Sequence, residues 1–185
     1  EFGAVTGTLT VAEDTAAGAV VASLSATDAD SDTLSYALVS GNDTGLFELS
    51  GTDVQITRAP TDADVGSYQL EVEVSDGNGG VDTVAFTVVV TNENDAPVAV
   101  ADVATTAEET PVTIDVLGND TDADGDSLSI DGTPSAGNGT VVVNGDGSLT
   151  YTPAADFVGT DTITYQVTDG NGGTDTGEVT VNVSN

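Results

Sequence analysis

The chain carries a short aspartate motif twice. Asp28-Ala29-Asp30-Ser31-Asp32 returns 94 positions later as Asp122-Ala123-Asp124-Gly125-Asp126, in a chain with 32 acidic residues and one basic residue, Arg58. Grouped carboxylates repel one another and raise each other's pKa unless something neutralises them, and the chain has no Lys or His to do so. The motif therefore predicts a bound hard cation. Calcium, which takes about six to eight oxygen ligands, suits these donors.

The composition limits the class of protein. The net charge of −31 over 185 residues argues against binding to nucleic acid or to an anionic membrane surface, because both need basic patches. The absence of Cys removes disulfides, thiolate metal sites and thiol catalysis. No apolar run reaches the roughly 20 residues that a membrane-spanning helix needs, so direct membrane insertion is not expected. A hydrophobic content of 38% is enough for a packed core.

The aspartate motif belongs to a longer internal repeat. At a shift of 93 to 95 positions, Ala12-Glu13-Asp14-Thr15 aligns with Ala107-Glu108-Glu109-Thr110, and Asp76-Gly77-Asn78-Gly79-Gly80 aligns with 169–173. A period of this length suits a whole small sandwich domain per copy. The sequence thus predicts two domains, 1–95 and 96–185, with a linker over 92–97 and a new strand beginning at Val98.

The elements that position these motifs are expected to be strands. Leu70, Val72 and Val74 alternate with polar residues, which indicates strands with one buried face, and helical periodicity is absent. Strands are expected over 7–11, 20–26, 34–39, 54–57, 70–74, 86–90, 112–116, 140–143, 148–152, 162–167 and 178–183. Turn signals between them give about seven strands per copy. The predicted fold is all-β, with two tandem antiparallel β-sandwiches.

The order of the acidic motifs resembles that of tandem cadherin-like repeats, the bacterial Ig-like or cadherin repeats of large RTX-type bacterial adhesins. The resemblance implies a Greek-key sandwich and calcium ions held at the junction between repeats. The ligands that it implies are Glu13, Asp62, Asp64, Asn94 and Asp95 from the first copy and linker, and Asp122, Asp124 and Asp169 from the second. Two departures weaken the match: the pair Asp62 and Asp64 stands where the family usually has Asp-Arg-Glu, and Asn92 replaces a usual Asp.

The same resemblance implies ligands for junctions with further repeats. Asp28, Asp30 and Asp76 would serve a preceding domain, and Glu108 or Glu109 with Asp156 would serve a following one. Only the junction between the two copies is complete in this sequence, so fuller calcium occupancy is expected there.

Two alternative interpretations compete with junction ligands. Residues Asp120 to Asp131 fit the spacing of an EF-hand loop, but the flanking sequence has strand and turn character. Asp-rich loops are also ordinary turn material, and this interpretation is adopted for Asp43, Asp53, Asp102, Asp131 and Asp146.

The resulting functional expectation is a calcium-rigidified extender segment of a bacterial cell-surface or secreted adhesin, extracellular, monomeric and in contact with neighbouring repeats of its own chain. The alternative is a calcium-dependent module for polysaccharide binding or homophilic adhesion, as in a biofilm, although 4% aromatic content with no Trp offers poor material for a sugar platform. An enzyme is not expected, since His, Cys and Lys are all absent.

Overall fold

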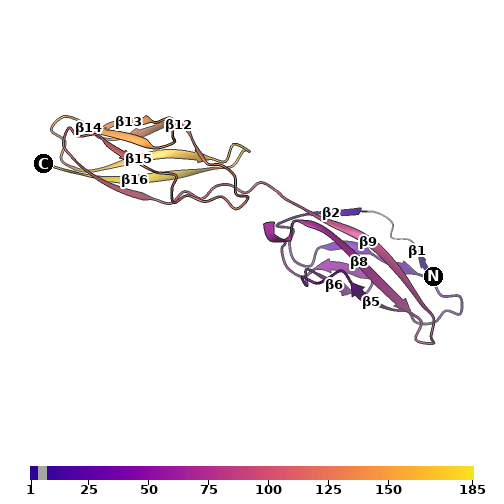
Figure 1. Ribbon diagram of the computed structural model, residues 1–185. Coiled ribbons are helices and arrows are strands. Elements are labelled where there is room, and N and C mark those ends of the chain that lie inside the picture. Colours follow the sequence, from indigo (N-terminus) through magenta and orange to yellow (C-terminus); the bar gives the residue numbers. More distant parts are fainter. Residues whose placement is uncertain (4–7) are drawn as a thin grey trace. The chain divides into compact units, whose positions relative to one another are not determined.

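The computed structural model describes residues 1–3 and 8–185, and they form two compact units, Glu1–Glu93 and Asn94–Asn185 (Figure 1). The division between Glu93 and Asn94 falls inside the segment 92–97. Gly7, where the first expected strand run begins, lies outside the described residues.

The first unit is a sandwich of a four-stranded and a three-stranded sheet. The larger sheet has the order β2-β9-β8-β5 and the smaller one β3-β7-β6, with a two-stranded ribbon β1-β4 beside them. Their bounds are β1 Phe2–Gly3, β2 Thr8–Ala12, β3 Val20–Ser23, β4 Ser25–Ala26, β5 Ser35–Ser40, β6 Phe47–Ser50, β7 Asp53–Ile56, β8 Gly66–Ser75 and β9 Val81–Thr91.

The second unit repeats this topology. Its larger sheet has the order β10-β16-β15-β12 and its smaller sheet the order β11-β14-β13. Their bounds are β10 Asp102–Ala107, β11 Val112–Ile114, β12 Ser129–Ala136, β13 Gly139–Val143, β14 Leu149–Pro153, β15 Gly159–Thr168 and β16 Thr174–Ser184. In each unit the first long strand pairs in parallel with the last one, β2 with β9 and β10 with β16, and the other pairs are antiparallel.

Each unit has its own core, built by strand alternation. In β8, Leu70, Val72 and Val74 are buried while the intervening side chains are not, which confirms the period-two prediction. The second core includes Tyr151, a fully buried side chain, and β-branched residues of β15 and β16. Burial of one face per strand fixes the register, because a slip of one residue would move the apolar face into water.

β1, β6 and β12 were not predicted from the sequence, and the start of β10 was predicted too early. Val98 forms only an isolated bridge with Thr121, and the strand proper begins at Asp102. Between them, carboxylates replace a neighbouring strand: the Ala99 N–H donates to Asp175 at 2.9 Å and the Val100 N–H to Asp120 at 2.7 Å. Side chains thus satisfy backbone groups that a ladder would otherwise pair.

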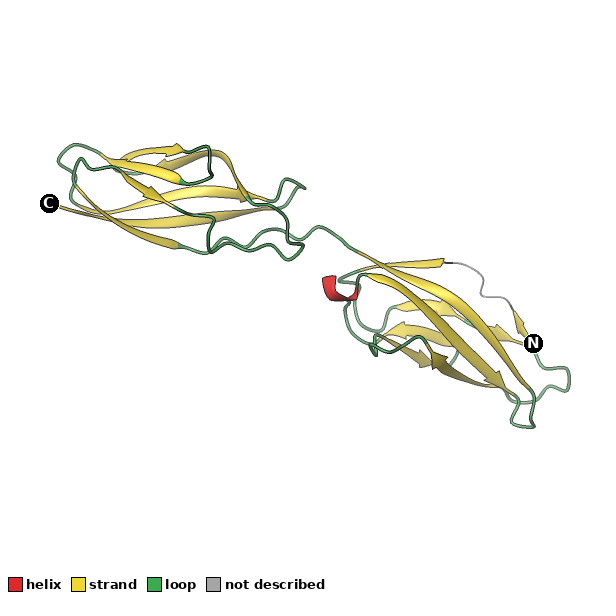
Figure 2. Ribbon diagram, viewed as in Figure 1, coloured by secondary structure: helices red, strands yellow, loops and turns green. Residues whose placement is uncertain are grey.

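The EF-hand interpretation is wrong. Among residues 1–3 and 8–185 the one helical element is a 3-10 turn, Asp62–Asp64 (Figure 2). The segment 120–131 instead runs through a loop into β12, so it lacks the two helices that hold an EF-hand loop.

Candidate metal sites

The first aspartate motif forms a carboxylate cluster in the first unit. Asp28, Asp32 and Asp76 each present a carboxylate oxygen, and these oxygens lie within 4.8 Å of one another. The loop is shaped by its own side chain, since Asp28 Oδ1 accepts the N–H groups of Asp30 at 2.8 Å and Asp32 at 3.1 Å. Calcium–oxygen distances of about 2.3–2.6 Å place ligand oxygens up to about 5 Å apart, so this spacing suits one calcium ion.

The second motif forms the corresponding cluster in the second unit. Oxygens of Asp122, Asp124 and Asp126 lie within 4.8 Å of one another. The Asp126 N–H donates to Asp122 Oδ1 at 3.1 Å, and the Asp95 N–H donates to Asp124 Oδ2 at 2.7 Å. The other oxygen of Asp122 is buried without a hydrogen-bond donor among the described residues. A buried carboxylate oxygen without a donor is costly, and a cation would compensate it.

A glycine-rich loop steadies each cluster in the same way. The Asn78 amide donates to Asp32 Oδ2 at 2.9 Å, and the Asn171 amide donates to Asp126 Oδ2 at 2.7 Å. Neither Asn was predicted to have a role. The recurrence of Asp-Gly-Asn-Gly-Gly in both copies was the available signal.

Asp169 organises that loop in the second unit. Its Oδ1 accepts the N–H groups of Asn171, Gly172 and Gly173, and its Oδ2 accepts the Asn94 amide at 2.7 Å. The Asn94 hydrogen bond and the backbone donors hold the pKa of Asp169 below its usual value despite partial desolvation. Both oxygens are therefore engaged, and Asp169 contributes as a loop anchor that also fixes Asn94.

Glu13 and Asp62 lie on adjacent loops of the first unit. Glu13 is buried and accepts the N–H of Glu93, the last residue of the unit. The next residue, Asp14, donates its N–H to the Pro60 carbonyl at 3.1 Å, which ties this loop to the turn that carries Asp62. Asp62 Oδ1 is buried without a donor among the described residues.

Asp64, the other half of the predicted mid-domain pair, lies in an ion pair. Arg58 donates to both of its oxygens, at 2.6 and 2.7 Å, and Thr61 donates from its N–H and its hydroxyl. The Arg58 hydrogen bonds lower the pKa of Asp64 to about 2, against the opposing effect of burial. Both Asp64 oxygens already accept hydrogen bonds from a neighbouring cation, so they are less available to a metal ion than those of Asp62.

The remaining predicted ligands are not gathered into clusters. Asp30 is exposed and stands outside the cluster formed by Asp28, Asp32 and Asp76. Glu108 sits at the start of a turn, where its N–H donates to the Ser184 carbonyl at 2.8 Å. Asp156 is exposed in a loop, with a φ of 56°. No interaction between Glu108 and Asp156 is present among the described residues.

Three aspartates interpreted as turn residues lie in strands instead: Asp53 in β7, Asp102 in β10 and Asp131 in β12. Asp102 receives hydrogen bonds from Asn119 at 3.1 Å and from the Tyr165 hydroxyl at 3.4 Å. Burial, and then the nearby charge of Asp120, raise the pKa of Asp102. Asp102 thus lies on an edge strand beside the buried Tyr165. The turn propensity of Asp could not predict this position.

Comparison with known proteins agrees with the repeated architecture. The family model of the bacterial Ig domain matches twice in tandem, over residues 3–89 and 94–182. The chain belongs to the bacterial Ig domain family. The two family matches confirm the predicted all-β fold with tandem repeats. No match is found among curated proteins.

Solved cadherin structures share the fold. The EC1-2 crystal structure of human Protocadherin-24 superposes with a TM-score of 0.64 at 18% identity, covering 100% of this chain and 97% of that one. Drosophila N-cadherin EC1-4 gives 0.65 at 17% identity, covering 100% and 49%. Protocadherin gammaB7 EC3-6 gives 0.56 at 18%, covering 100% and 47%, so the bacterial Ig chain spans about half the length of the latter two. At these identities the likeness shows the fold alone.

The tandem Ig architecture suggests an extracellular adhesion or extender module, and domains of this type are usually non-enzymatic. No helix among the described residues is long and apolar enough to cross a membrane.

Proposed function

We propose that this pair of bacterial Ig domains is a calcium-rigidified extender segment of a bacterial surface or secreted adhesin of the RTX type. The observation that carries the proposal is the placement of carboxylates along the chain. Glu13 accepts the N–H of the last residue of the first unit, and Asn94 and Asp95, the first two residues of the second unit, are bonded to Asp169 and Asp124. Acidic side chains of each unit therefore accept hydrogen bonds from the connecting residues 93–95.

The proposed ligands for this connection are Glu13, Asp62, Asn94, Asp95, Asp122 and Asp124. The donor set fits calcium, because it consists of carboxylate and amide oxygens. It also includes buried oxygens of Asp62 and Asp122 that accept no hydrogen bond from the residues that the structure describes. Unneutralised, these charges repel one another; when calcium binds, it replaces that repulsion with shared coordination. The bound ions would hold the connection in one geometry, which is what a rigid spacer requires.

The direct test is calorimetric titration of calcium into the chain and into two charge-matched variants. Asp124→Asn removes a proposed ligand, whereas Glu178→Gln removes an exposed carboxylate on β16. We expect Asp124→Asn to lose at least about tenfold in affinity for one class of sites, about 1.4 kcal/mol. Glu178→Gln should titrate as the unaltered chain does. Equal isotherms for the two variants would refute the assignment.

Rigidification is tested separately by small-angle scattering. The maximum dimension and its spread are compared in saturating calcium and in chelator, for the unaltered chain and for Asp95→Ala. We expect calcium to narrow the distribution in the unaltered chain, with a smaller effect in the variant. Calcium binding without any change in scattering would leave a metal-binding protein but remove the extender mechanism.

A further inference from the structure

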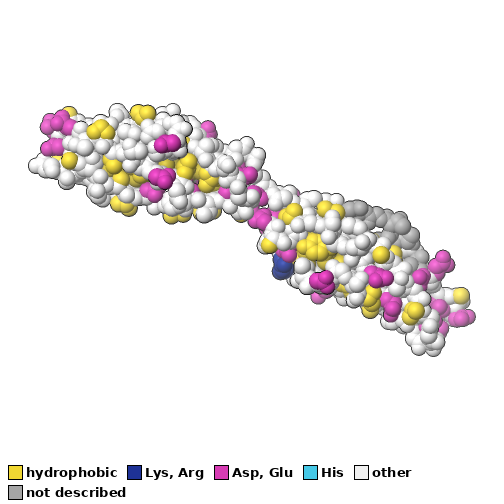
Figure 3. All heavy atoms as spheres, in the orientation of Figure 1, with side chains coloured by type: hydrophobic (Ala, Val, Ile, Leu, Met, Phe, Trp, Pro, Cys, Tyr) yellow, Lys and Arg dark blue, Asp and Glu magenta, His cyan; other side chains and the backbone are white. Residues whose placement is uncertain are grey.

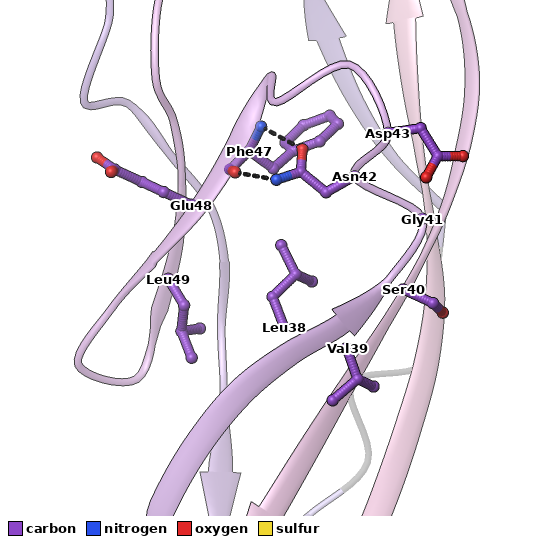
Figure 4. A pocket seen from close by; sticks show the side chains of 9 residues that line it. All are labelled: Leu38, Val39, Ser40, Gly41, Asn42, Asp43, Phe47, Glu48 and Leu49. Carbon is purple, nitrogen blue, oxygen red and sulfur yellow. Dashed lines mark hydrogen bonds between the residues drawn. The ribbon is translucent and has the colours of Figure 1, made fainter.

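The first unit has an open hollow of about 460 Å³ between β5 and β6 (Figure 4). β5 is the last strand of the four-stranded sheet and β6 is the last strand of the three-stranded sheet. The hollow therefore lies along one open side of the sandwich, where neither sheet continues. Its volume falls within the range of about 300–1,000 Å³ that is typical of small ligand sites.

One end of β6 is already capped by a side chain that imitates a strand. The Phe47 N–H donates to Asn42 Oδ1 at 2.9 Å, and the Asn42 amide donates back to the Phe47 carbonyl (Figure 4). The backbone groups of Phe47 thus point away from β7, toward the hollow side. The Leu46 carbonyl points the other way, because it accepts the Thr57 N–H. By the alternation along the strand, the backbone groups of Glu48 also point toward β7.

In an antiparallel ladder, backbone groups alternate in direction along a strand, so Leu49 should point outward as Phe47 does. Leu49 lies two residues beyond Phe47, opposite Val54, so its N–H and C=O point to the same outer side. β6 pairs only with β7 among the described residues, and Asn42 serves only Phe47. The edge at Leu49 is therefore open for a further strand to pair with it.

The hollow is lined by apolar side chains and by acidic side chains at its rim. Leu38 and Leu49 flank the space, and Val39 on β5 is 48% exposed. Asp43 and Glu48 are exposed at the rim. A strand laid here would place alternate side chains against the apolar wall and the others toward carboxylates.

The charge balance identifies the kind of occupant. The chain has a net charge of −31, and its one basic side chain, Arg58, is bound to Asp64. Acidic side chains dominate the charged surface in Figure 3. A second copy would bring the same negative charge to the rim and be repelled, whereas a cationic segment would be attracted.

We propose that the hollow between β5 and β6 binds an extended peptide segment with alternating apolar and basic residues, which pairs with β6 at Leu49. The apolar side chains would enter the space beside Leu38 and Val39, and lysine or arginine side chains would face Asp43 and Glu48. Main-chain hydrogen bonds would supply affinity and the hollow would supply side-chain selectivity.

The loop that joins these two strands differs between the units. β5 and β6 are joined by residues 41–46, whereas their counterparts β12 and β13 are joined by residues 137–138. That short turn is fastened by Asp161, which accepts the N–H groups of Gly137 at 3.1 Å and Asn138 at 2.7 Å. The longer loop that carries Asn42 therefore distinguishes the two repeats and does not follow from the shared fold.

The test uses a capped hexapeptide of alternating lysine and valine, added to the isotopically labelled full chain in saturating calcium, with amide shifts recorded by NMR. We expect shifts confined to Val39, Asn42, Leu49 and their neighbours. An otherwise identical peptide that is N-methylated at alternate residues cannot pair and should not bind, and a glutamate–valine peptide should not bind either.

Matched protein variants separate docking from general attraction to an acidic surface. Val39→Lys places a cation in the hollow, whereas Val20→Lys makes the same charge change at a 51% exposed site on β3, the other edge of the small sheet. We expect at least about tenfold weaker binding for Val39→Lys and a change within about twofold for Val20→Lys. Equal weakening of both, or undiminished binding of the methylated peptide, would overturn the proposal. Concentration-dependent shifts at the same residues without peptide would overturn it in favour of a second copy.

Discussion

At the scale of single residues, aspartate serves two different purposes in this Ig-domain chain. Asp161 and Asp169 have both oxygens filled by donors, and Asp64 is filled by Arg58 and Thr61, so these three organise protein. Asp122 instead keeps a buried oxygen that has no donor in the described part of the chain. Both kinds lie in similar Asp- and Gly-rich sequence, and the difference depends on which backbone N–H groups the folded loops bring to each carboxylate.

The ion pair of Asp64 gives a prediction about its titration. With a folded pKa of about 2, below its usual 3.8, Asp64 contributes stability that is present above pH 4 and is lost as the pH falls through about 2. In Arg58→Gln the main cause of the depression is gone, so the pKa should rise toward 3.8 and the loss should begin at higher pH. NMR titration of the Asp64 carboxyl carbon measures this. An unchanged midpoint would show that Thr61 alone holds the charge.

Backbone strain gives a second prediction, with a matched pair of sites. Ser31 has a φ of 65°, and the equivalent residue of the second motif, Gly125, has a φ of 76°. A side chain disfavours this conformation by about 1–2 kcal/mol, while glycine costs somewhat more entropy on folding. In chelator, Ser31→Gly should stabilise the first unit by up to about 1 kcal/mol and Gly125→Ser should destabilise the second by a similar amount.

Urea unfolding of each variant measures both changes. A Cβ at Gly125 would meet no atom within 4 Å, so the serine tests strain without a clash. Shifts of the same sign in both variants would contradict the strain account.

At the scale of elements, strands with strict alternation were predictable and the other strands were not. β8 and β9 repeat apolar residues at every second position, and the core of the first unit uses them. β12 contains Gly132 and Pro134 and has an irregular register between Asp131 and Ser135, so its sequence shows turn character. β10 is a half-exposed edge strand whose Val103 faces solvent. Pairing with β15 and β16 makes strands of these segments, and such pairing is not encoded locally.

Asp161 offers a prediction at this scale, because it links three elements. It lies at 4% exposure in β15, accepts the backbone of the β12–β13 turn, and accepts the Tyr151 hydroxyl of β14 at 2.8 Å. Asp161→Ala would leave several buried donors without an acceptor, at roughly 1–3 kcal/mol each before water enters. We expect the second unit to lose about 3 kcal/mol in urea unfolding.

The control for Asp161 is Asp131→Ala, an exposed aspartate of β12, which should change stability by less than about 0.5 kcal/mol. Tyr151→Phe removes one of the donors and should cost about 1 kcal/mol. If Asp161→Ala cost no more than Tyr151→Phe, the turn would not depend on the carboxylate.

At the scale of the whole molecule, the main feature is a net charge of −31, because 32 acidic residues face a single basic residue. Under the proposed function, calcium bound only by the folded state adds about 2.7 kcal/mol per site at a hundredfold excess over its dissociation constant. For domains of this size, 1 kcal/mol shifts the melting temperature by about 4–8 °C. One such site per unit should therefore raise the melting temperature by about 10–20 °C.

The control for this prediction is sodium chloride at equal ionic strength, which screens charge but does not chelate. Melting is followed by calorimetry in calcium, in sodium chloride and in chelator. A rise in sodium chloride as large as that in calcium would mean general screening, and specific sites would be excluded.

The sequence by itself determined the class of the chain: the alternation of apolar residues required sheets, and the period near 94 required two copies. The surplus of carboxylates predicts a bound cation. These are properties of composition and periodicity, and they hold wherever the chain folds. The tertiary structure decided which carboxylates are open and which are occupied. Asp64 accepts from Arg58 and Thr61 only when the chain folds into the turn at Asp62–Asp64, and Asp169 accepts the Asn94 amide only when segments far apart in the sequence meet. It also decided that β5 and β6 end their sheets side by side at an uncovered edge. No local pattern encodes that neighbourhood, since strand order depends on pairing between segments far apart in the chain.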